Sequence, residues 1–484
     1  MHTPLLKDAP RILIHVRGLM NPYDTDFWQS LRYSLNKKNY ELLLITYNMP
    51  KHPCDLPFLK CLSGLDGASV MKVSFNEGWN SWLPFSKDLD EDELLERESF
   101  WRGKEYSVYH LERRRWGLYF YKNFYTTVLQ AVKPVLTVIW NCQHPQEMIF
   151  ERLARKCGCP VLFLERGPFF GTLHFDSEGI LGGTSVANQI KQGWEIKENP
   201  EYWTKAFLKI KDDYQKKKRT WWNQPGTIGP EKLRKKLRIK PNSKVLLFAG
   251  QVDEDVQNLF YSPNFKDNLS AFKWLYDNLE DKENIFILGK HHPMSKKSPN
   301  IYNDIIKKNG IWTDKASLED CLALADRIAA VNSTVLYEAL LMDKPILSMG
   351  KSLLFGKGIA YEINDLDKDK KIIDDWLEAK DFDLKKERFL NFGAYLFSSV
   401  FFSMDSSEKD FKLRGADELA QHLIENTVHQ KNLNYNSILM DMTIFDKMLF
   451  FDNNLNKFSS ETFYLIKRRI KRFIGNTLKS LKLR

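Results

Sequence analysis

The sequence predicts an α/β protein with two Rossmann-like, doubly wound domains and a helical C-terminal extension. Short apolar runs alternate with helix-length segments, a pattern typical of parallel strands joined by crossover helices. Both halves of the chain begin with a strand, a helix and a second strand. We therefore expect one domain over residues 1–230, a second over residues 231–400, and the extension over residues 401–484.

The first domain opens with a buried strand over residues 11–16, a helix over 26–36 and a strand over 41–47. Further expected elements are strands over 134–140 and 160–164, and helices over 146–156 and 201–219. The polar, basic stretch over 220–240 is expected to connect the two domains.

Glu165 directly follows one of these strands and precedes Arg166, Gly167 and Pro168. Ligands of doubly wound sheets bind beyond the C-terminal ends of the strands, which makes Glu165 a candidate functional carboxylate. An ion pair with Arg166 or a helix cap is the alternative. Residues 172–183, which include Asp176, are expected to form a loop at the same edge.

The second domain contains three predicted strands, over residues 245–249, 285–288 and 328–331, each followed by a polar cluster. These clusters contain Asp253 and Asp255, then Lys290, His291 and His292, and then Ser333 and Thr334. Because the C-terminal ends of parallel strands share one edge of a sheet, we expect the clusters to meet in space.

The third cluster is suited to an anion. Ser333 and Thr334 precede a helix, whose free N–H groups and positive end attract phosphate, although the same residues also serve as plain helix caps. The cationic and donor groups of residues 290–292 favour the same anion. Glu338, one turn into the helix, is placed to accept from ribose hydroxyls or simply to stabilise the helix end.

Asp253 and Asp255 permit two interpretations. An Asp-x-Asp pair after a strand is suited to hold a divalent cation on a nucleoside diphosphate. Alternatively, one carboxylate attacks an anomeric carbon while a second carboxyl group, such as Glu165, exchanges the proton of the entering or leaving oxygen.

The composition is that of a globular protein, with 484 residues, 43% hydrophobic residues and 28% charged residues. The net charge of +10 favours an anionic partner. Nucleic acid is the weakest candidate, because basic residues are dispersed and no recognition motif occurs. The six cysteines show no regular spacing of a disulfide framework, so we expect free thiols. The sequence shows no signal-peptide pattern and no membrane-spanning apolar run, so we expect a cytoplasmic location.

Residues 463–484 combine apolar positions at helical spacing with many Lys and Arg residues. A basic amphipathic helix of this kind suits an anionic membrane surface, so we expect peripheral association with the inner membrane. The alternative is a helix docked on the protein itself.

Four segments, in this order, resemble the bacterial capsule-polysaccharide synthesis family: residues 164–168 with 172–179, 250–255, 290–293, and 332–340. The resemblance extends over about residues 134–361. That family includes retaining β-Kdo transferases that use CMP-Kdo. The resemblance implies a GT-B-like fold with two domains facing across a cleft, in which the first domain is on the acceptor side and the second binds the CMP-sugar.

The resemblance also implies roles for individual residues. Asp255 corresponds to the nucleophile and Glu165 to the acid/base. The nucleotide would be held by Gln251, Lys290, His291, His292, Pro293, Ser333, Thr334 and Glu338. Which of the two histidines contacts it is left open by the sequence.

The favoured function is therefore transfer of Kdo, or a related ulosonic acid, from a CMP-sugar to a glycan or glycolipid acceptor. Since CMP carries one phosphate, we expect no cofactor and no required divalent metal. One alternative is a metal-dependent glycosyltransferase using a nucleoside-diphosphate sugar. The other is a non-catalytic glycan- or lipid-binding module of a capsule assembly complex.

Overall fold

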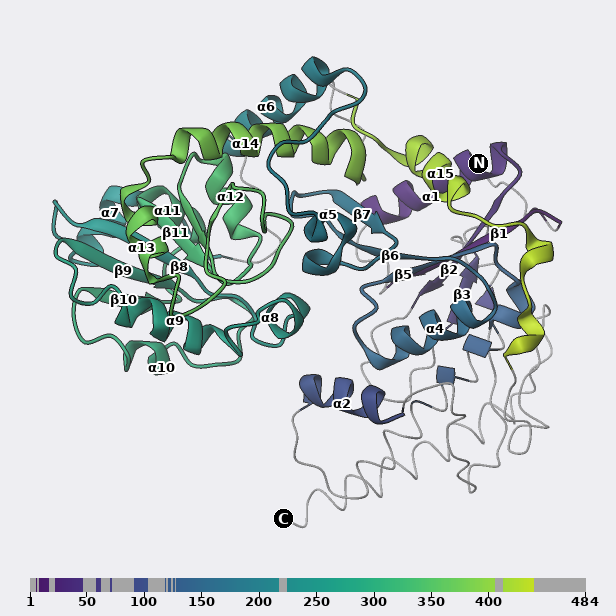
Figure 1. The fold of residues 1–484 in the computed structure, drawn as a ribbon, viewed down its shortest axis with the longest axis horizontal. Helices are drawn as coiled ribbons and strands as arrows, with labels where there is room; N and C mark the ends of the chain where they lie inside the picture. Colours follow the sequence, from purple (N-terminus) through teal and green to yellow (C-terminus); the bar gives the residue numbers. More distant parts are fainter. Residues whose placement is uncertain are drawn as a thin grey trace, which may run out of the picture.

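The computed structural model describes residues 6, 8–16, 22–46, 58–61, 70–71, 91–102, 118, 121–122, 125–126, 128–216, 224–404 and 412–438. In this part of the chain the strands form two separate sheets, each flanked by helices (Figure 1). The predicted fold class, two doubly wound α/β domains, is confirmed.

The first sheet has the strand order β14-β7-β6-β5-β1-β2-β3-β4. Its parallel centre consists of β1 (Arg11–Val16), β2 (Glu41–Thr46), β5 (Leu136–Trp140) and β6 (Val161–Arg166). The outer strands are antiparallel to the preceding strand of the sheet: β3 (Phe58–Cys61) to β2, β4 (Val70–Met71) to β3, β7 (Thr172–Asp176) to β6, and β14 (Phe401–Ser403) to β7. The accompanying helices are α1 (Pro22–Lys37), α2 (Glu91–Arg102), α4 (Pro145–Lys156), the short η2 (Leu181–Gly183) and α5 (Ser185–Asn188).

The central strands of this sheet are buried on both faces, which explains their continuous apolar sequences. Leu13 belongs to a core with Ile149 and Phe150 of α4, whereas its neighbours Ile12 and Ile14 belong to a core with α1. Successive side chains of a strand point to opposite faces, so one apolar run supplies both cores.

The segment over residues 172–183 was expected to be a loop, and this prediction was wrong for its first part. Thr172–Asp176 forms β7, whose residues are all buried and which pairs with both β6 and β14. The polar Thr172 and Asp176 and the glycines that follow weaken the strand signal in the sequence, and only pairing with β14 from far along the chain makes the segment an interior strand.

The second sheet is parallel throughout, in the order β10-β9-β8-β11-β12-β13. Its strands are β8 (Lys244–Ala249), β9 (Ile285–Lys290), β10 (Gly310–Thr313), β11 (Arg327–Ala330), β12 (Ile346–Ser348) and β13 (Tyr361–Glu362). Its helices are α7 (Pro230–Lys236), α8 (Val256–Phe260), α9 (Asn268–Asp277), α10 (Asn300–Asn303), α11 (Leu318–Leu324), α12 (Val335–Leu341) and α13 (Lys370–Glu378).

Two long helices connect the sheets: α6 (Pro200–Lys216) leads out of the first, and α14 (Phe382–Tyr395) leads back (Figure 1). After the π-helical turn η3 (Leu396–Val400), the chain adds β14 to the first sheet, and α15 (Ala416–Glu425) packs on α1. The short turns η4 (Gln430–Asn432) and η5 (Tyr435–Ser437) follow. Residues 401–438, set apart as an extension in the sequence analysis, therefore contribute to the first domain.

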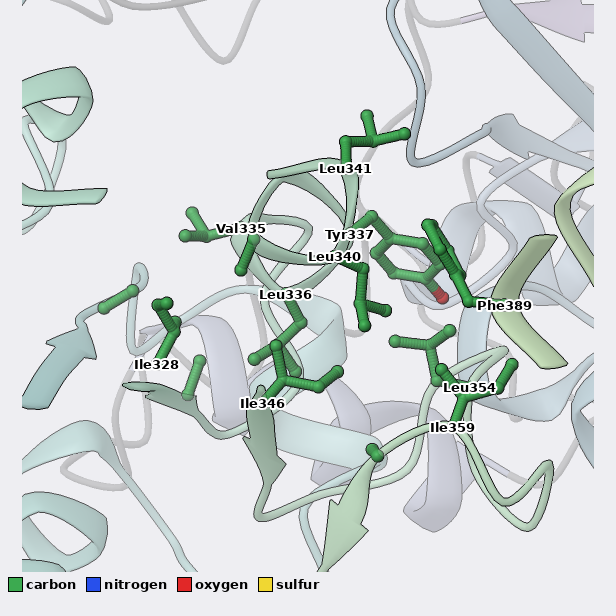
Figure 2. Packing of buried hydrophobic residues seen from close by; sticks show 14 of the residues in the cluster. Ile328, Val335, Leu336, Tyr337, Leu340, Leu341, Ile346, Leu354, Ile359 and Phe389 are labelled. Carbon is green, nitrogen blue, oxygen red and sulfur yellow. The ribbon is translucent and has the colours of Figure 1, made fainter. Parts of the chain in front are cut away.

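A shared apolar core joins the two domains at this connection. Phe169, in the loop after β6, lies 5.8 Å from the ring of Tyr337 on α12 and 5.3 Å from that of Phe397. Figure 2 shows α12 in this cluster, with Tyr337 and Leu340 on its inner side and Phe389 of α14 nearby. The loop that follows Glu165 is thus anchored by packing against the second domain.

The basic segment over residues 463–484 lies outside the described residues, so its predicted helix stays a prediction. Within the described part of the chain, no helix is both long and apolar enough to cross a membrane. Cys142, Cys157, Cys159 and Cys321 are free and buried, as expected for these four.

Candidate active site

The three polar clusters of the second domain lie at one edge of its sheet, as the strand pattern predicts. They follow β8, β9 and β11, which are adjacent in the sheet, with β8 in the middle. The loops also touch: the N–H of Gly250 donates to the carbonyl of Lys290 at 3.0 Å. The structure therefore brings together residues that are separated by more than 80 positions in the sequence.

A buried amide pair fixes this edge. Nε2 of Gln251 donates to Oδ1 of Asn332 at 2.9 Å, and the N–H of Asn332 donates back to Oε1 of Gln251 at 3.1 Å. Nδ2 of Asn332 in turn donates to the carbonyls of Gln257 and Tyr261, at 2.7 and 3.1 Å. Gln251, predicted to contact the nucleotide, thus binds the protein and helps to hold α8 in place.

Asp255, the predicted nucleophile, is the N-cap of α8. Its Oδ1 accepts from the N–H of Gln257 at 2.9 Å, while the side chain stays exposed to solvent. Desolvation by the surrounding protein raises the pKa of its carboxyl group, and the bond from Gln257 partly offsets the rise. A carboxylate that is open to solvent yet partly desolvated is well suited to react with an electrophilic carbon.

Asp253 has a different environment. Its Oδ1 accepts from the N–H and Nδ2 of Asn268, at 2.8 and 2.7 Å, and Nζ of Lys297 lies 3.1 Å from its Oδ2. These contacts tie the β8 loop to α9. Among the described residues, no group of three or more His, Cys, Asp or Glu side chains is arranged to hold a metal ion.

The cluster after β9 is built around Trp312. Its Nε1 donates to Nδ1 of the buried His291 at 3.0 Å, so the proton of a neutral His291 lies on Nε2. The ring fits only because residues 250 and 289 are glycines: a Cβ on Gly289 would lie 2.0 Å from it, and one on Gly250 would lie 2.9 Å away. Burial and the neighbouring Lys290 lower the pKa of His291.

Lys290, His292 and Pro293 complete this cluster. Lys290 is buried, its Nζ donates to the carbonyl of His291 at 2.6 Å, and desolvation lowers its pKa. Nδ1 of His292 accepts from the N–H of Met294 at 3.1 Å, and burial lowers its pKa to about 4. His292 is half-buried whereas His291 is buried, so His292 is the more accessible of the two histidines. Pro293 is exposed.

At the third cluster, Thr334 is exposed at the start of α12 and makes no side-chain cap bond, whereas Oγ of Ser333 accepts from the N–H of Val335 at 3.3 Å. Glu338 lies one turn further on, and its carboxylate accepts from the hydroxyl of Tyr214 on α6. The structure thus places Glu338 against the helix that connects the domains.

Glu165, the predicted acid/base, lies at the C-terminal end of β6. Its Oε1 accepts from the N–H of Arg166 at 2.9 Å, and its Oε2 accepts from Nδ2 of Asn141 at 2.7 Å. Asn141 follows β5, the neighbouring strand. The sequence analysis did not select Asn141, although a polar residue directly after a buried strand is the same signal that identified Glu165.

Asp176 shapes the loop after β7. Its buried carboxylate accepts from the N–H of Glu178 at 2.8 Å, from that of Gly179 at 3.2 Å and from Oγ of Ser185 at 2.5 Å. The loop brings two glycines, Gly182 and Gly183, to the second domain. The Asp176 carboxylate therefore holds this loop in shape, and it does so through hydrogen bonds to the protein's own groups.

The segment that carries Asp255 meets the first domain through Tyr261, at the end of α8. A Cβ on Gly182 would lie 2.9 Å from the ring of Tyr261, and one on Gly183 would lie 2.7 Å from its hydroxyl. Burial raises the pKa of Tyr261 to about 12, and the negative charge of Glu165 adds to this rise. The end of α8, the helix that Asp255 caps, thus lies against the loop after β7, and β7 pairs with β6, the strand that carries Glu165.

Further bonds cross the boundary beside this contact. Nζ of Lys351 donates to Oδ1 of Asn188 at 2.8 Å. Nζ of the fully buried Lys357 donates to the carbonyls of Gln189 and Phe355, the latter at 2.9 Å. Burial lowers the pKa of Lys357 to about 8. An ammonium group of the second domain thereby binds the end of α5 in the first.

These observations define a two-domain α/β protein with candidate site residues on both sides of the domain boundary. Residues 187–396 match the family described as capsule polysaccharide biosynthesis protein. The match confirms, over these residues, the resemblance that the sequence motifs indicate. The motif around Glu165 precedes the matched segment.

Similar solved structures include two transferases of Thermosulfurimonas dismutans KpsC. The β-Kdo 2,7-transferase is 16% identical and the alignment covers 66% of this chain and 97% of the other, with a TM-score of 0.39. The β-Kdo 2,4-transferase is 18% identical, with coverages of 60% and 87% and a TM-score of 0.39. The N-terminal domain of a Candida albicans trehalose-6-phosphate phosphatase is 12% identical, with coverages of 88% and 99% and a TM-score of 0.41. No curated protein matches the sequence.

Proposed function

We propose that the protein is a glycosyltransferase of capsule, O-antigen or lipopolysaccharide synthesis that transfers Kdo, or a related ulosonic acid, from a CMP-sugar to a glycan or glycolipid acceptor. The observation that supports the proposal is the approach of Tyr261, at the end of the Asp255 segment, to Gly182 and Gly183 of the first domain, where the negative charge of Glu165 also contributes to the raised pKa of Tyr261. The match of residues 187–396 to a capsule polysaccharide family supports the same pathway class.

The proposed reaction has two displacements. The Asp255 carboxylate attacks the anomeric carbon of the sugar, a carbon–oxygen bond forms, and the bond to the phosphate oxygen breaks to release CMP. An acceptor hydroxyl then attacks the same carbon, Glu165 takes its proton, and the bond to Asp255 breaks. Two inversions give overall retention of configuration.

The nucleotide is proposed to lie against the edge formed by residues 290–293 and 333–334. Thr334 is exposed there, and the neutral His292 is the more accessible histidine. A hydroxyl and an imidazole N–H can both donate to a phosphate. The Glu338 carboxylate accepts a hydrogen bond from the Tyr214 hydroxyl. A ribose hydroxyl would therefore bind this carboxylate either beside Tyr214 or in its place.

The donor is tested by binding and by turnover. We expect CMP to raise the melting temperature of the full-length protein more than UDP or GDP at equal concentration, because the site is proposed for a single phosphate. With CMP-Kdo and a panel of glycan acceptors, EDTA should leave the transfer rate unchanged. Preferential stabilisation by UDP or GDP, together with loss of turnover in EDTA, would instead favour the metal-dependent diphosphate-sugar enzyme.

The basic segment over residues 463–484 is proposed to hold the protein on an anionic membrane surface. Full-length protein should co-sediment with vesicles containing phosphatidylglycerol, bind neutral vesicles weakly, and be released by high salt because the attraction is electrostatic. A chain truncated after Glu461 should lose this binding while still binding CMP. Equal sedimentation of the truncated and full-length chains would remove the tail from this role.

A further inference from the structure

We propose that Asn141 is a positioning residue of the transfer reaction, which holds Glu165 through Nδ2 and presents Oδ1 to a hydroxyl group of the acceptor. This inference deepens the proposed function and rests on it. It assigns a role to a residue of the first domain, the side expected to receive the acceptor.

The first observation is the register of β5 and β6. The N–H of Asn141 donates to the carbonyl of Leu164 at 2.8 Å, which extends the strand ladder by one residue and sets Asn141 beside Glu165. Nδ2 of Asn141 then donates to Oε2 of Glu165 at 2.7 Å. A carboxylate with a donor on each oxygen, here Asn141 and the N–H of Arg166, is held in one orientation.

The second observation is the backbone conformation. Asn141 and Cys142 have φ angles of 65° and 52°, and they are the only consecutive non-glycine residues with positive φ in the part of the chain that the structure describes. Asparagine tolerates this left-handed region, whereas cysteine is disfavoured in it. Backbone strain of this kind persists where the surrounding structure imposes it, and it is common at functional sites.

The third observation points to a ligand. Asn141 is 7% exposed, and its Oδ1 has no hydrogen-bond partner among the described residues. A buried acceptor without a donor is unfavourable, so natural proteins rarely keep one without a function. The amide has its Nδ2 on Glu165, so its oxygen is available for a group that donates. A sugar hydroxyl beside the base that removes its proton has the required chemistry.

The nearby titratable groups make the pH dependence interpretable. On the described elements around Glu165 they are Arg166 on β6, His174 on β7, Cys142 after β5 and Tyr261 after α8. Burial lowers the pKa of His174 to about 4 and raises that of Cys142 well above its ordinary value, and the pKa of Tyr261 is raised to about 12. His174, Cys142 and Tyr261 are therefore not expected to change charge between pH 5 and 8.

The test compares Asn141→Gly with Asn141→Asp in the full-length protein. Both glycine and aspartate tolerate positive φ, so the backbone should be retained. With Gly, loss of the Nδ2 donor disfavours the ionised form of Glu165. The acid limb of the pH–rate profile, where transfer slows as the pH falls, should therefore move to higher pH. We also expect kcat to fall about tenfold or more and the KM for the acceptor to rise. With Asp, a second negative charge beside Glu165 should move the limb further.

Release of CMP in the absence of acceptor separates this inference from the proposed function. The first displacement does not use Asn141, so its rate and the binding of CMP should match those of the wild type in both variants. Asn284→Gly is the matched control. Asn284 is an exposed asparagine with a positive φ of 58° just before β9, at the N-terminal ends of the strands of the second sheet, whereas the candidate site lies at their C-terminal ends. Wild-type kcat, acceptor KM and acid limb in the Asn141→Gly variant would overturn the role of Asn141. A wild-type protein that neither binds CMP nor releases it from CMP-Kdo would overturn the proposed function instead.

Discussion

Replacing Asp255 by Asn is expected to abolish sugar transfer, with a fall in rate of about 10³-fold or more, because an amide is a poor nucleophile at the anomeric carbon. The choice of Asn matters, since Asp255 has two functions. Its Oδ1 caps α8 through the N–H of Gln257, and asparagine caps a helix about as well as aspartate does. The variant should therefore unfold at nearly the wild-type temperature while losing activity.

The control variant is Asp255→Ala, which removes both functions. It should lose the same activity and, in addition, about 1 kcal/mol of stability through the missing cap. Intact-mass spectrometry after mixing with CMP-Kdo should detect a sugar adduct on the wild-type chain that is absent from both variants. Transfer by Asp255→Asn at more than a few per cent of the wild-type rate would exclude Asp255 as the nucleophile.

How much of the site could be predicted from the sequence depends on the type of signal. The clusters after β8, β9 and β11 could be predicted, because short apolar runs identify parallel strands and the C-terminal ends of such strands share one edge. The partners of the polar residues within those clusters could not. In the sequence Gln251 and Glu338 are polar residues at an exposed edge, whereas in the structure they bind Asn332 and Tyr214.

Long-range contacts explain the remaining differences. β14 joins the first sheet after the chain has passed through the whole second domain, and α15 packs on α1, nearly 400 residues earlier. Nothing local in residues 172–176 or 401–403 specifies that they pair. The convergence of Glu165, Gly182 and Tyr261 likewise depends on how the domains dock, which strand periodicity does not report.

The second large effect is expected for Glu165→Gln, and it should affect only the second displacement. Glutamine has nearly the same size, and its Oε1 can still accept from the N–H of Arg166. Its Nε2 would meet Nδ2 of Asn141, but rotation of the Asn141 amide would present the oxygen that now lacks a partner. The fold should therefore tolerate the change, whereas loss of the base should slow transfer about 10²- to 10⁴-fold.

Azide distinguishes this role from a structural one, since an anionic nucleophile needs no base to remove a proton. With Glu165→Gln, a first displacement that forms the sugar ester of Asp255 should proceed, and azide should intercept the ester and restore CMP turnover with a glycosyl azide as product. With Asp255→Asn, azide should restore no retaining turnover, because no ester forms. Failure of azide to restore turnover in a folded, CMP-binding Glu165→Gln variant would argue that this carboxylate positions the substrate and does not exchange its proton.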